Sequence, residues 1–197
     1  MTLRKDIAEI ISSQAGMITS RQATEAGLSS TLLSRYVREG LLFRESAGVY
    51  VLPDGMVDPM FLLSLKIPFG TFSHGSALFL LGLTDRTPLE CEMTIARAMT
   101  VTTSLRNAVK LFYVQDELSK LGVTKVRTQF GNFVPCYDVE RTVCDLIRNR
   151  RRVGEEIVID GLKQYANSKE KNLARLSEYA EKLGVAERVK QSLEVVL

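Results

Sequence analysis

The chain has 197 residues, of which 45% are hydrophobic and 25% are charged, as is ordinary for a folded soluble protein. This length fits one large domain or two small ones. The formal net charge of +3 is too small to indicate nucleic-acid binding by itself, so the distribution of charge along the chain must decide.

Membrane and secreted classes are not expected. The longest apolar cluster, residues 77–83, is far shorter than the roughly 18 apolar residues that a membrane span needs. The amphipathic, partly acidic start of the chain does not resemble a signal peptide. Cys91, Cys136 and Cys144 are odd in number and lack CxxC spacing, which argues against a disulfide framework and a cysteine zinc site. We therefore expect a cytoplasmic protein in a reducing compartment.

His74 is the only histidine in the sequence, and this limits the kinds of active site that the chain can form. One chain with one histidine cannot build a multi-histidine metal site, and a Ser-His-Asp or Cys-His site would depend on His74 alone. The residue follows Ser73 at an expected helix start, so we interpret it as structural. The chain also has no GxxxxGK[ST], GxGxxG or GxSxG motif. We predict no enzyme activity, no catalytic residue, no metal and no cofactor.

Three helices are expected first. Apolar residues recur at helical spacing in residues 3–14, and Ala15-Gly16 ends that helix. Thr19 is placed to cap a short helix that runs to Ala26, and Gly27 supplies a tight turn. Ser29 or Ser30 then begins a helix that continues to about residue 39, where Gly40 stops it.

A hairpin follows the three helices. Residues 41–44 and 49–52 have the composition of strands, and residues 45–48 form the turn between them. This order is that of a winged helix-turn-helix. Ala23 lies where two crossing helices would be closest, and Gly27 lies where the chain reverses. The sequence thus predicts a winged helix-turn-helix DNA-binding domain over residues 1–55.

Residues 57–197 are expected to form a second domain of mixed sheet and helices, so the fold class is α+β. The expected helices are 58–65 and 73–83, and the expected strands are 90–96, 110–115, 124–130 and 133–137, the last two joined at Gly131-Asn132. From about residue 138 the pattern is helical, over 138–149, 155–167, 170–183 and 185–196.

The third helix places short hydroxyls and arginines opposite its buried face. Arginine bonds guanine through two atoms, and serine or threonine contacts a base or a phosphate. The start of the second helix suits a phosphate because of its free amides and dipole. The wing contributes further polar groups. The predicted DNA-binding residues are Thr19, Ser20, Arg21, Ser29, Ser30, Thr31, Ser34, Arg35, Arg38, Arg44 and Ser46.

The balanced charge of residues 1–55 weakens the case for DNA binding. The six basic residues there are matched by six acidic ones, and winged helices also serve as protein–protein modules. Few phosphate contacts make binding by one copy weak and salt-sensitive. We therefore expect two copies on paired half-sites.

Three segments carry a family resemblance: SHGSALFLLGLTDRTP (73–88), TQFGNFVPCYD (128–138) and DVERTVCDLIRNRR (138–151). Together with the N-terminal module, they resemble the AbiEi antitoxins of the AbiE abortive-infection system, a type IV toxin–antitoxin system of phage resistance. The resemblance implies an autoregulatory repressor that binds inverted repeats in its own promoter. It also implies a C-terminal antitoxin domain that counteracts a nucleotidyltransferase-like toxin without a stable complex.

The resemblance directs attention to a basic cluster in the second domain. Four arginines within five positions exceed what a helix end needs to complement its dipole. We interpret the cluster as an antitoxin surface, or as an extra contact to nucleic acid. The predicted residues are Arg141, Arg148, Arg150, Arg151, Arg152 and Lys163.

Two other functions remain open. One is an effector-sensing repressor, whose C-terminal domain would hold a small ligand in a mostly apolar pocket. The other is a DNA-processing enzyme with clustered acids near strand ends. The candidates for such acids are Glu90, Glu92, Asp116 and Asp138.

Overall fold

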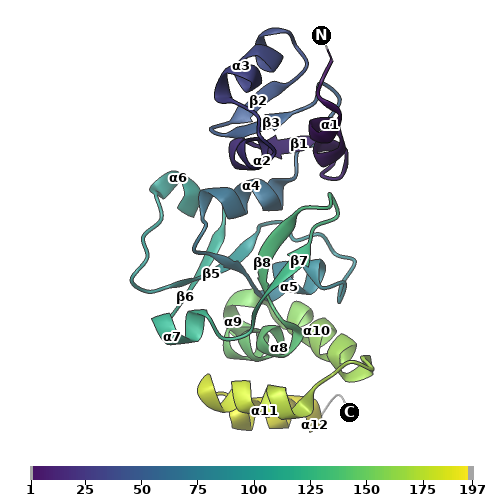
Figure 1. The fold of residues 1–197 in the computed structure, drawn as a ribbon. Coiled ribbons are helices and arrows are strands. Elements are labelled where there is room, and N and C mark those ends of the chain that lie inside the picture. Colours follow the sequence, from purple (N-terminus) through teal and green to yellow (C-terminus); the bar gives the residue numbers. More distant parts are fainter. Residues whose placement is uncertain (1, 195–197) are drawn as a thin grey trace. The chain divides into compact units, whose positions relative to one another are not determined.

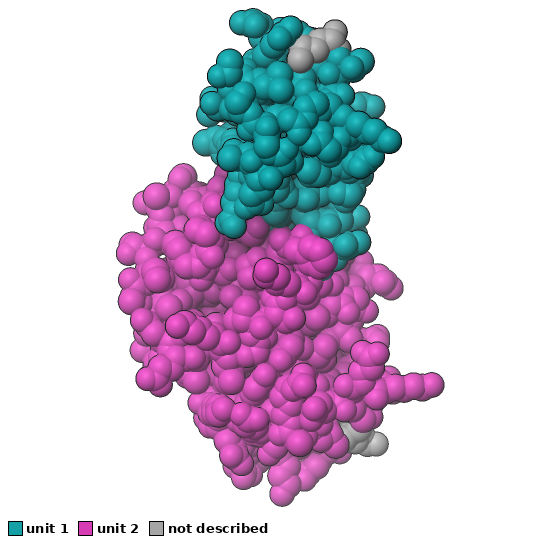
Figure 2. Space-filling model, in the orientation of Figure 1, with its two compact units in different colours: residues 1–62, 127–132 teal, residues 63–126, 133–197 magenta. Residues whose placement is uncertain are grey.

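The computed structural model describes residues 2–194 and confirms the predicted α+β fold class (Figure 1). The chain divides into two units, which are described separately. Unit 1 contains residues 1–62 and 127–132, and unit 2 contains residues 63–126 and 133–197 (Figure 2). The predicted domain boundary at residues 55–57 stays a prediction.

Unit 1 has the expected order of helices and hairpin, with one additional strand. The sheet has the order β1-β3-β2, and both pairings are antiparallel. The hairpin turn is shorter than predicted, because β2 extends to Ser46 and leaves only Ala47-Gly48 between the strands. The elements are α1 (Lys5–Ser12), β1 (Met17–Thr19), α2 (Ser20–Glu25), α3 (Ser30–Arg38), β2 (Phe43–Ser46) and β3 (Val49–Val51).

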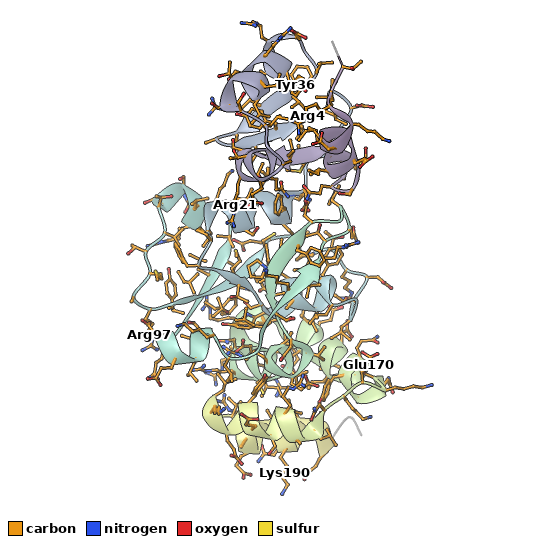
Figure 3. All side chains as sticks on the ribbon, in the orientation of Figure 1. Arg4, Arg21, Tyr36, Arg97, Glu170 and Lys190 are labelled. Carbon is orange, nitrogen blue, oxygen red and sulfur yellow. The ribbon has the colours of Figure 1, made fainter. Side chains whose placement is uncertain are left out.

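The core of unit 1 forms where the apolar faces of the helices meet. Ile7 and Ile11 of α1 are fully buried, as the helical spacing predicts, and Leu33 and Tyr36 of α3 are buried with them. The Tyr36 hydroxyl accepts a hydrogen bond from the Arg4 backbone N–H at 3.3 Å, so the buried tyrosine keeps a polar partner (Figure 3).

A buried carboxylate ties the two chain segments of unit 1 together. Asp58, 1% exposed, accepts hydrogen bonds at Oδ2 from the Thr128 hydroxyl (2.6 Å) and the Asn132 amide (2.9 Å). Its Oδ1 accepts the Phe61 backbone N–H at 3.0 Å, at the start of α4 (Pro59–Lys66). The predicted Gly131-Asn132 turn is thus fixed by a buried, fully engaged acid.

Unit 2 is built on a five-stranded sheet of order β6-β5-β4-β8-β7. β4 pairs antiparallel with β5 and parallel with β8, and β5 pairs parallel with β6. Its elements are β4 (Thr71–Phe72), α5 (His74–Leu80), β5 (Glu92–Ala96), α6 (Thr103–Arg106), β6 (Lys110–Val114), α7 (Asp116–Ser119), β7 (Val123–Arg127), β8 (Phe133–Tyr137), α8 (Val139–Arg148), α9 (Arg150–Val153), α10 (Glu155–Asn167), α11 (Leu173–Lys182) and α12 (Ala186–Glu194). The predicted end of the last helix, residue 196, lies outside the described residues.

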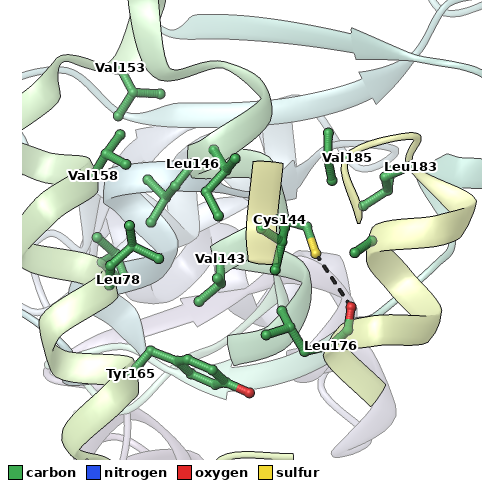
Figure 4. Packing of buried hydrophobic residues seen from close by; sticks show 14 of the residues in the cluster. Leu78, Val143, Cys144, Leu146, Val153, Val158, Tyr165, Leu176, Leu183 and Val185 are labelled. Carbon is green, nitrogen blue, oxygen red and sulfur yellow. Dashed lines mark hydrogen bonds between the residues drawn. The ribbon is translucent and has the colours of Figure 1, made fainter. Parts of the chain in front are cut away.

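Helix α8 is the centre of this unit, since α5, α10, α11 and α12 all pack against it. Its residues Val143, Cys144 and Leu146 are fully buried, and the Cys144 thiol donates to the Leu176 carbonyl at 3.9 Å (Figure 4). Burial raises the pKa of this thiol to about 12. Cys144 is therefore a small core residue.

His74 is buried and structural, but Ser73 does not cap α5 as expected. The Ser73 hydroxyl makes no cap hydrogen bond and instead lies 2.9 Å from the hydroxyl of Thr94 and 2.9 Å from His74 Nδ1. The imidazole stacks on Phe112 with 3.6 Å between ring centroids. His74 also has a φ of +51°, a conformation that few side chains adopt.

Candidate nucleic-acid interface

The start of α2 is held by a capping box. The Thr19 hydroxyl accepts the Gln22 backbone N–H at 3.2 Å, and the Gln22 side chain accepts the Thr19 backbone N–H at 2.9 Å. Thr19 is only 8% exposed. The prediction that Thr19 contacts DNA is therefore wrong, because its hydroxyl is buried and already bonded. The spacing Thr19-x-x-Gln22 was itself the sequence signal for this role.

The turn between α2 and α3 has the predicted geometry, together with a clamp that the sequence did not reveal. Gly27 adopts φ +75°, and the Leu28 N–H bonds the carbonyl of the buried Ala23 at 2.8 Å. The Arg4 guanidinium donates to the carbonyls of Ala26 (2.8 Å) and Gly27 (3.2 Å). An arginine from outside the motif thus fixes the turn that sets the angle between the two helices.

The predicted polar face of α3 is exposed. Leu33 and Tyr36 point into the core of unit 1, whereas the opposite face is open to solvent. Ser29 is the N-cap, and its hydroxyl accepts the Leu32 N–H at 3.2 Å while the residue stays exposed. The exposed side chains of the helix are Ser30, Thr31, Ser34, Arg35 and Arg38.

Two of the four candidate arginines are partnered by exposed acids one turn later. Arg21 lies 2.8 Å from Glu25, and Arg35 lies 2.9 Å from Glu39. The hydrogen bond from Glu25 raises the pKa of Arg21, so its charge persists at every physiological pH. Within the described residues, the guanidinium groups of Arg38 and Arg44 have neither a hydrogen bond nor an ion pair. Exposed pairs of this kind are worth only about 0.3–0.5 kcal/mol, so a phosphate or base can displace the acid.

The wing is anchored to the start of α2. The Ser20 backbone N–H donates to the Gly48 carbonyl at 2.8 Å, and Gly48 turns the hairpin with φ +74°. The ladder between β2 and β3 is irregular between Arg44 and Ser46, where a bulge interrupts the register. The hydrogen bond between Ser20 and Gly48 therefore connects the β2–β3 hairpin, which carries Arg44 and Ser46, to the start of α2.

The predicted antitoxin surface needs one correction. Arg141 is fully buried, so it cannot be part of any surface. Its Nε lies 2.9 Å from Asp145, and its Nη1 donates to the Leu118 (2.6 Å) and Leu121 (2.8 Å) carbonyls. The guanidinium also stacks over Tyr137, 4.1 Å from the ring centroid. Arg141 is a structural residue that fixes the loop before β7.

The other members of the cluster stay near the surface. Arg150, Arg151 and Arg152 of α9 and Lys163 of α10 are exposed, and Arg148 is half-buried. Arg150 pairs with Glu155 at the start of α10, so that acid neutralises an arginine as well as favouring the helix dipole.

The acidic residues considered as nuclease candidates do not form a cluster, and two of them, Asp138 and Glu92, have structural partners. Asp138 caps α8 by accepting the Arg141 N–H at 2.9 Å. Glu92 accepts the Gly75 N–H at 2.6 Å and pairs with Lys110 at 2.9 Å. Over residues 2–194, no group of three or more His, Cys, Asp or Glu side chains is arranged to hold a metal ion. None of the helices described is long and apolar enough to cross a membrane.

Comparison with known proteins identifies the N-terminal segment. Residues 5–53 match the model of a family described as transcriptional regulator, AbiEi antitoxin, which confirms the resemblance over that segment. No curated protein matches the chain. The crystal structure of the RV2827C protein from Mycobacterium tuberculosis is similar with a TM-score of 0.50 and 16% identity, over 98% of this chain and 82% of that chain. At this identity the similarity concerns the fold alone.

Proposed function

We propose, from the match of residues 5–53 to the family model of AbiEi antitoxin transcriptional regulators, that the chain is an antitoxin that represses its own promoter. The observation that carries the proposal is the exposed face of α3. Its hydroxyls and two guanidinium groups lie together on a helix whose opposite side is fixed in the core. Such a face suits the major groove of double-stranded DNA.

The contacts divide by role. The first turns of α3, with Thr31, Ser34 and Arg35, face base edges, while Arg38 lies one turn further along the same helix. Arg21 in the first turn of α2 binds phosphate, where the helix dipole adds to the attraction. Arg44 on β2 reaches the backbone or the minor groove. Because one copy makes few phosphate contacts, two copies occupy the inverted repeats of one operator.

The antitoxin role belongs to the C-terminal part of the chain. We infer that it counteracts a nucleotidyltransferase-like toxin without forming a stable complex, as the family resemblance implies. The arginine cluster 148–152, without Arg141, is the surface that we assign to this role, and Lys163 extends it. Charge reversal at Arg150, Arg151 and Arg152 should then abolish rescue of growth in cells that express the toxin. Full rescue by the reversed protein would rule out this surface.

The experiment for DNA binding is a fluorescence-anisotropy titration of the full chain on DNA from directly upstream of its own gene. A scrambled duplex of equal length is the competitor. The proposal predicts preferential binding of the upstream DNA at a ratio of two chains per site, and protection of two half-sites in footprinting. Equal affinity for both duplexes would contradict sequence-specific repression.

A further inference from the structure

An open groove of about 780 Å³ lies in unit 2, where two segments distant in the sequence meet. One wall comes from the end of α8, from α9 and from the start of α10, and the other comes from α12. The residues that line it are Ile147, Arg148, Asn149, Arg150, Arg151, Arg152, Glu155, Ile159, Leu162, Arg188, Gln191 and Ser192.

The groove carries a surplus of positive charge. Five arginines line it against a single carboxylate, that of Glu155, which is bound by Arg150. The sequence drew attention to four of these arginines, but not to Arg188, which lies 36 positions after Arg152 and reaches the groove only through the fold. This convergence of guanidinium groups from three helices, α8, α9 and α12, is more than a solvated helix end provides.

Several of these groups lack a protein partner. The Nη1 atom of Arg148 is buried and has no hydrogen bond. Among the residues described, the guanidinium groups of Arg151 and Arg188 take part in no hydrogen bond or ion pair. A buried donor without a partner is costly to maintain. The exposed guanidinium groups of Arg151 and Arg188 are free to bind an anion in the groove. Arg152, by contrast, is engaged, since it stacks over Phe112 at 4.3 Å and donates to the Leu111 carbonyl at 3.1 Å.

The second cavity of unit 2, of about 380 Å³, differs in its charge balance. Its Arg86 is paired with Glu156 (2.6 Å) and Asp160 (3.5 Å), and its Lys110 is paired with Glu92 (2.9 Å). Every cation there already has a carboxylate. Of these two cavities, lined by described residues, the arginine groove is the one with cations left unpaired for an external anion.

Apolar side chains also line the groove, and they favour an anion that carries an apolar or aromatic part. Ile147, Ile159 and Leu162 line the groove beside the arginines; Ile159 is 37% exposed, whereas Ile147 (3%) and Leu162 (4%) are buried beneath it. Guanidinium groups bind phosphate bidentately, and an isoleucine surface covers the face of a planar base. We propose that this groove binds a nucleoside phosphate, either a free nucleotide or the phosphorylated terminal nucleotide of an RNA strand.

The test is isothermal titration calorimetry on the full chain in magnesium-free buffer. The probes are ATP, adenosine, and a short single-stranded oligoribonucleotide with and without a 5′-phosphate. The variant R151E/R188E changes two exposed groups that have no partner among the described residues. The matched control K190E makes the same kind of charge change on α12, at an exposed position outside the groove (Figure 3). Thermal melts establish that both variants are folded.

The proposal predicts that ATP or the 5′-phosphorylated oligonucleotide binds, whereas adenosine and the unphosphorylated strand bind at least roughly tenfold more weakly. R151E/R188E should lose roughly tenfold or more in affinity, and K190E less than about twofold. Preference for ATP identifies a free nucleotide, and preference for the strand identifies an RNA terminus. No binding by either phosphorylated probe, or equal binding by R151E/R188E and wild type, would overturn the proposal. This inference builds on the antitoxin role proposed for residues 148–152, whereas operator binding measured on the same preparations reports separately on the proposed DNA-binding role of α3.

Discussion

The Nε atom of Arg35 lies 2.9 Å from the Oε1 atom of Glu39, one turn further along the exposed face of α3. The arginine side chain is 53% exposed and the glutamate 31% exposed, so the pair is held in water rather than in the core. It contributes little to the stability of the fold. The pair matters for DNA binding, because it holds the guanidinium along the surface of α3 until DNA replaces the acid.

Substitution of Arg35 by alanine should weaken specific DNA binding by roughly 1–3 kcal/mol and relax the preference at one base pair, because a bidentate contact to guanine is lost. The measurement is competition with operator duplexes that are altered at single positions. E39Q is the control, since it leaves the arginine and removes only its competitor, and should bind at least as tightly as wild type. Unchanged affinity and base preference in R35A would remove Arg35 from the reading surface.

Arg21 should behave differently from Arg35. Its place in the first turn of α2 suits a phosphate, so R21A should weaken binding to all sequences about equally. The slope of log affinity against log salt concentration should become shallower by about one, because one fewer counterion is released. Titrations at several salt concentrations on operator and scrambled DNA measure both effects. A sequence-selective loss with an unchanged slope would assign Arg21 a base contact instead.

The buried carboxylate of Asp58 should be a strong determinant of stability. D58A removes the acceptor for the Thr128 hydroxyl, the Asn132 amide and the Phe61 N–H, and should lower the free energy of unfolding by about 3 kcal/mol or more. D54A is the control, because Asp54 is exposed, and should change it by less than about 0.5 kcal/mol. Urea denaturation measures both values. Equal stability of the two variants would refute the role of Asp58.

His74 should make stability depend on pH. Burial lowers its pKa well below the usual 6.5, and the nearby cations Lys110, Arg141, Arg152 and Arg148 lower it further. The folded state therefore keeps a neutral imidazole, while the unfolded state takes up a proton near pH 6.5. Its contribution is fully present above that pH, and the free energy of unfolding falls as the pH is lowered toward the folded-state pKa, by up to about 1.4 kcal/mol per pH unit.

The measurement is urea denaturation of wild type and H74N between about pH 7.5 and 5.5. Asparagine is chosen because it tolerates the left-handed conformation that His74 adopts at φ +51°. H74N should be less stable than wild type at neutral pH, since it loses the stacking on Phe112, but its stability should vary less with pH over this range. An identical pH slope in both proteins would show that His74 does not titrate on unfolding.

Local features were predictable where one segment determines them. The exposed face of α3, the turn at Gly27 and the cap at Asp138 follow from side-chain spacing and from backbone preferences within about one turn of helix. The central helix α8 was equally clear, because its apolar residues repeat at helical spacing. These features include the surface on which the proposed DNA contact depends.

Features that depend on distant segments were not predictable in the same way. β1 has only three residues, all buried, and becomes a strand because β3 pairs with it across 30 residues of chain. Arg141 was assigned to a surface because its neighbours Arg148 and Arg150 are basic, yet its guanidinium is drawn inward by Asp145 and two carbonyls. Arg188 joins the arginine groove only through the packing of α12.

The most direct test of the central claim, that the exposed face of α3 binds the operator, is the affinity of S34A/R35A/R38A for the upstream DNA of its own gene. These positions do not contribute to the core, so the variant should unfold like the wild type. We expect the triple variant to bind operator and scrambled DNA with the same weak affinity, while K190A retains full discrimination. Wild-type discrimination by S34A/R35A/R38A would show that another surface reads the DNA.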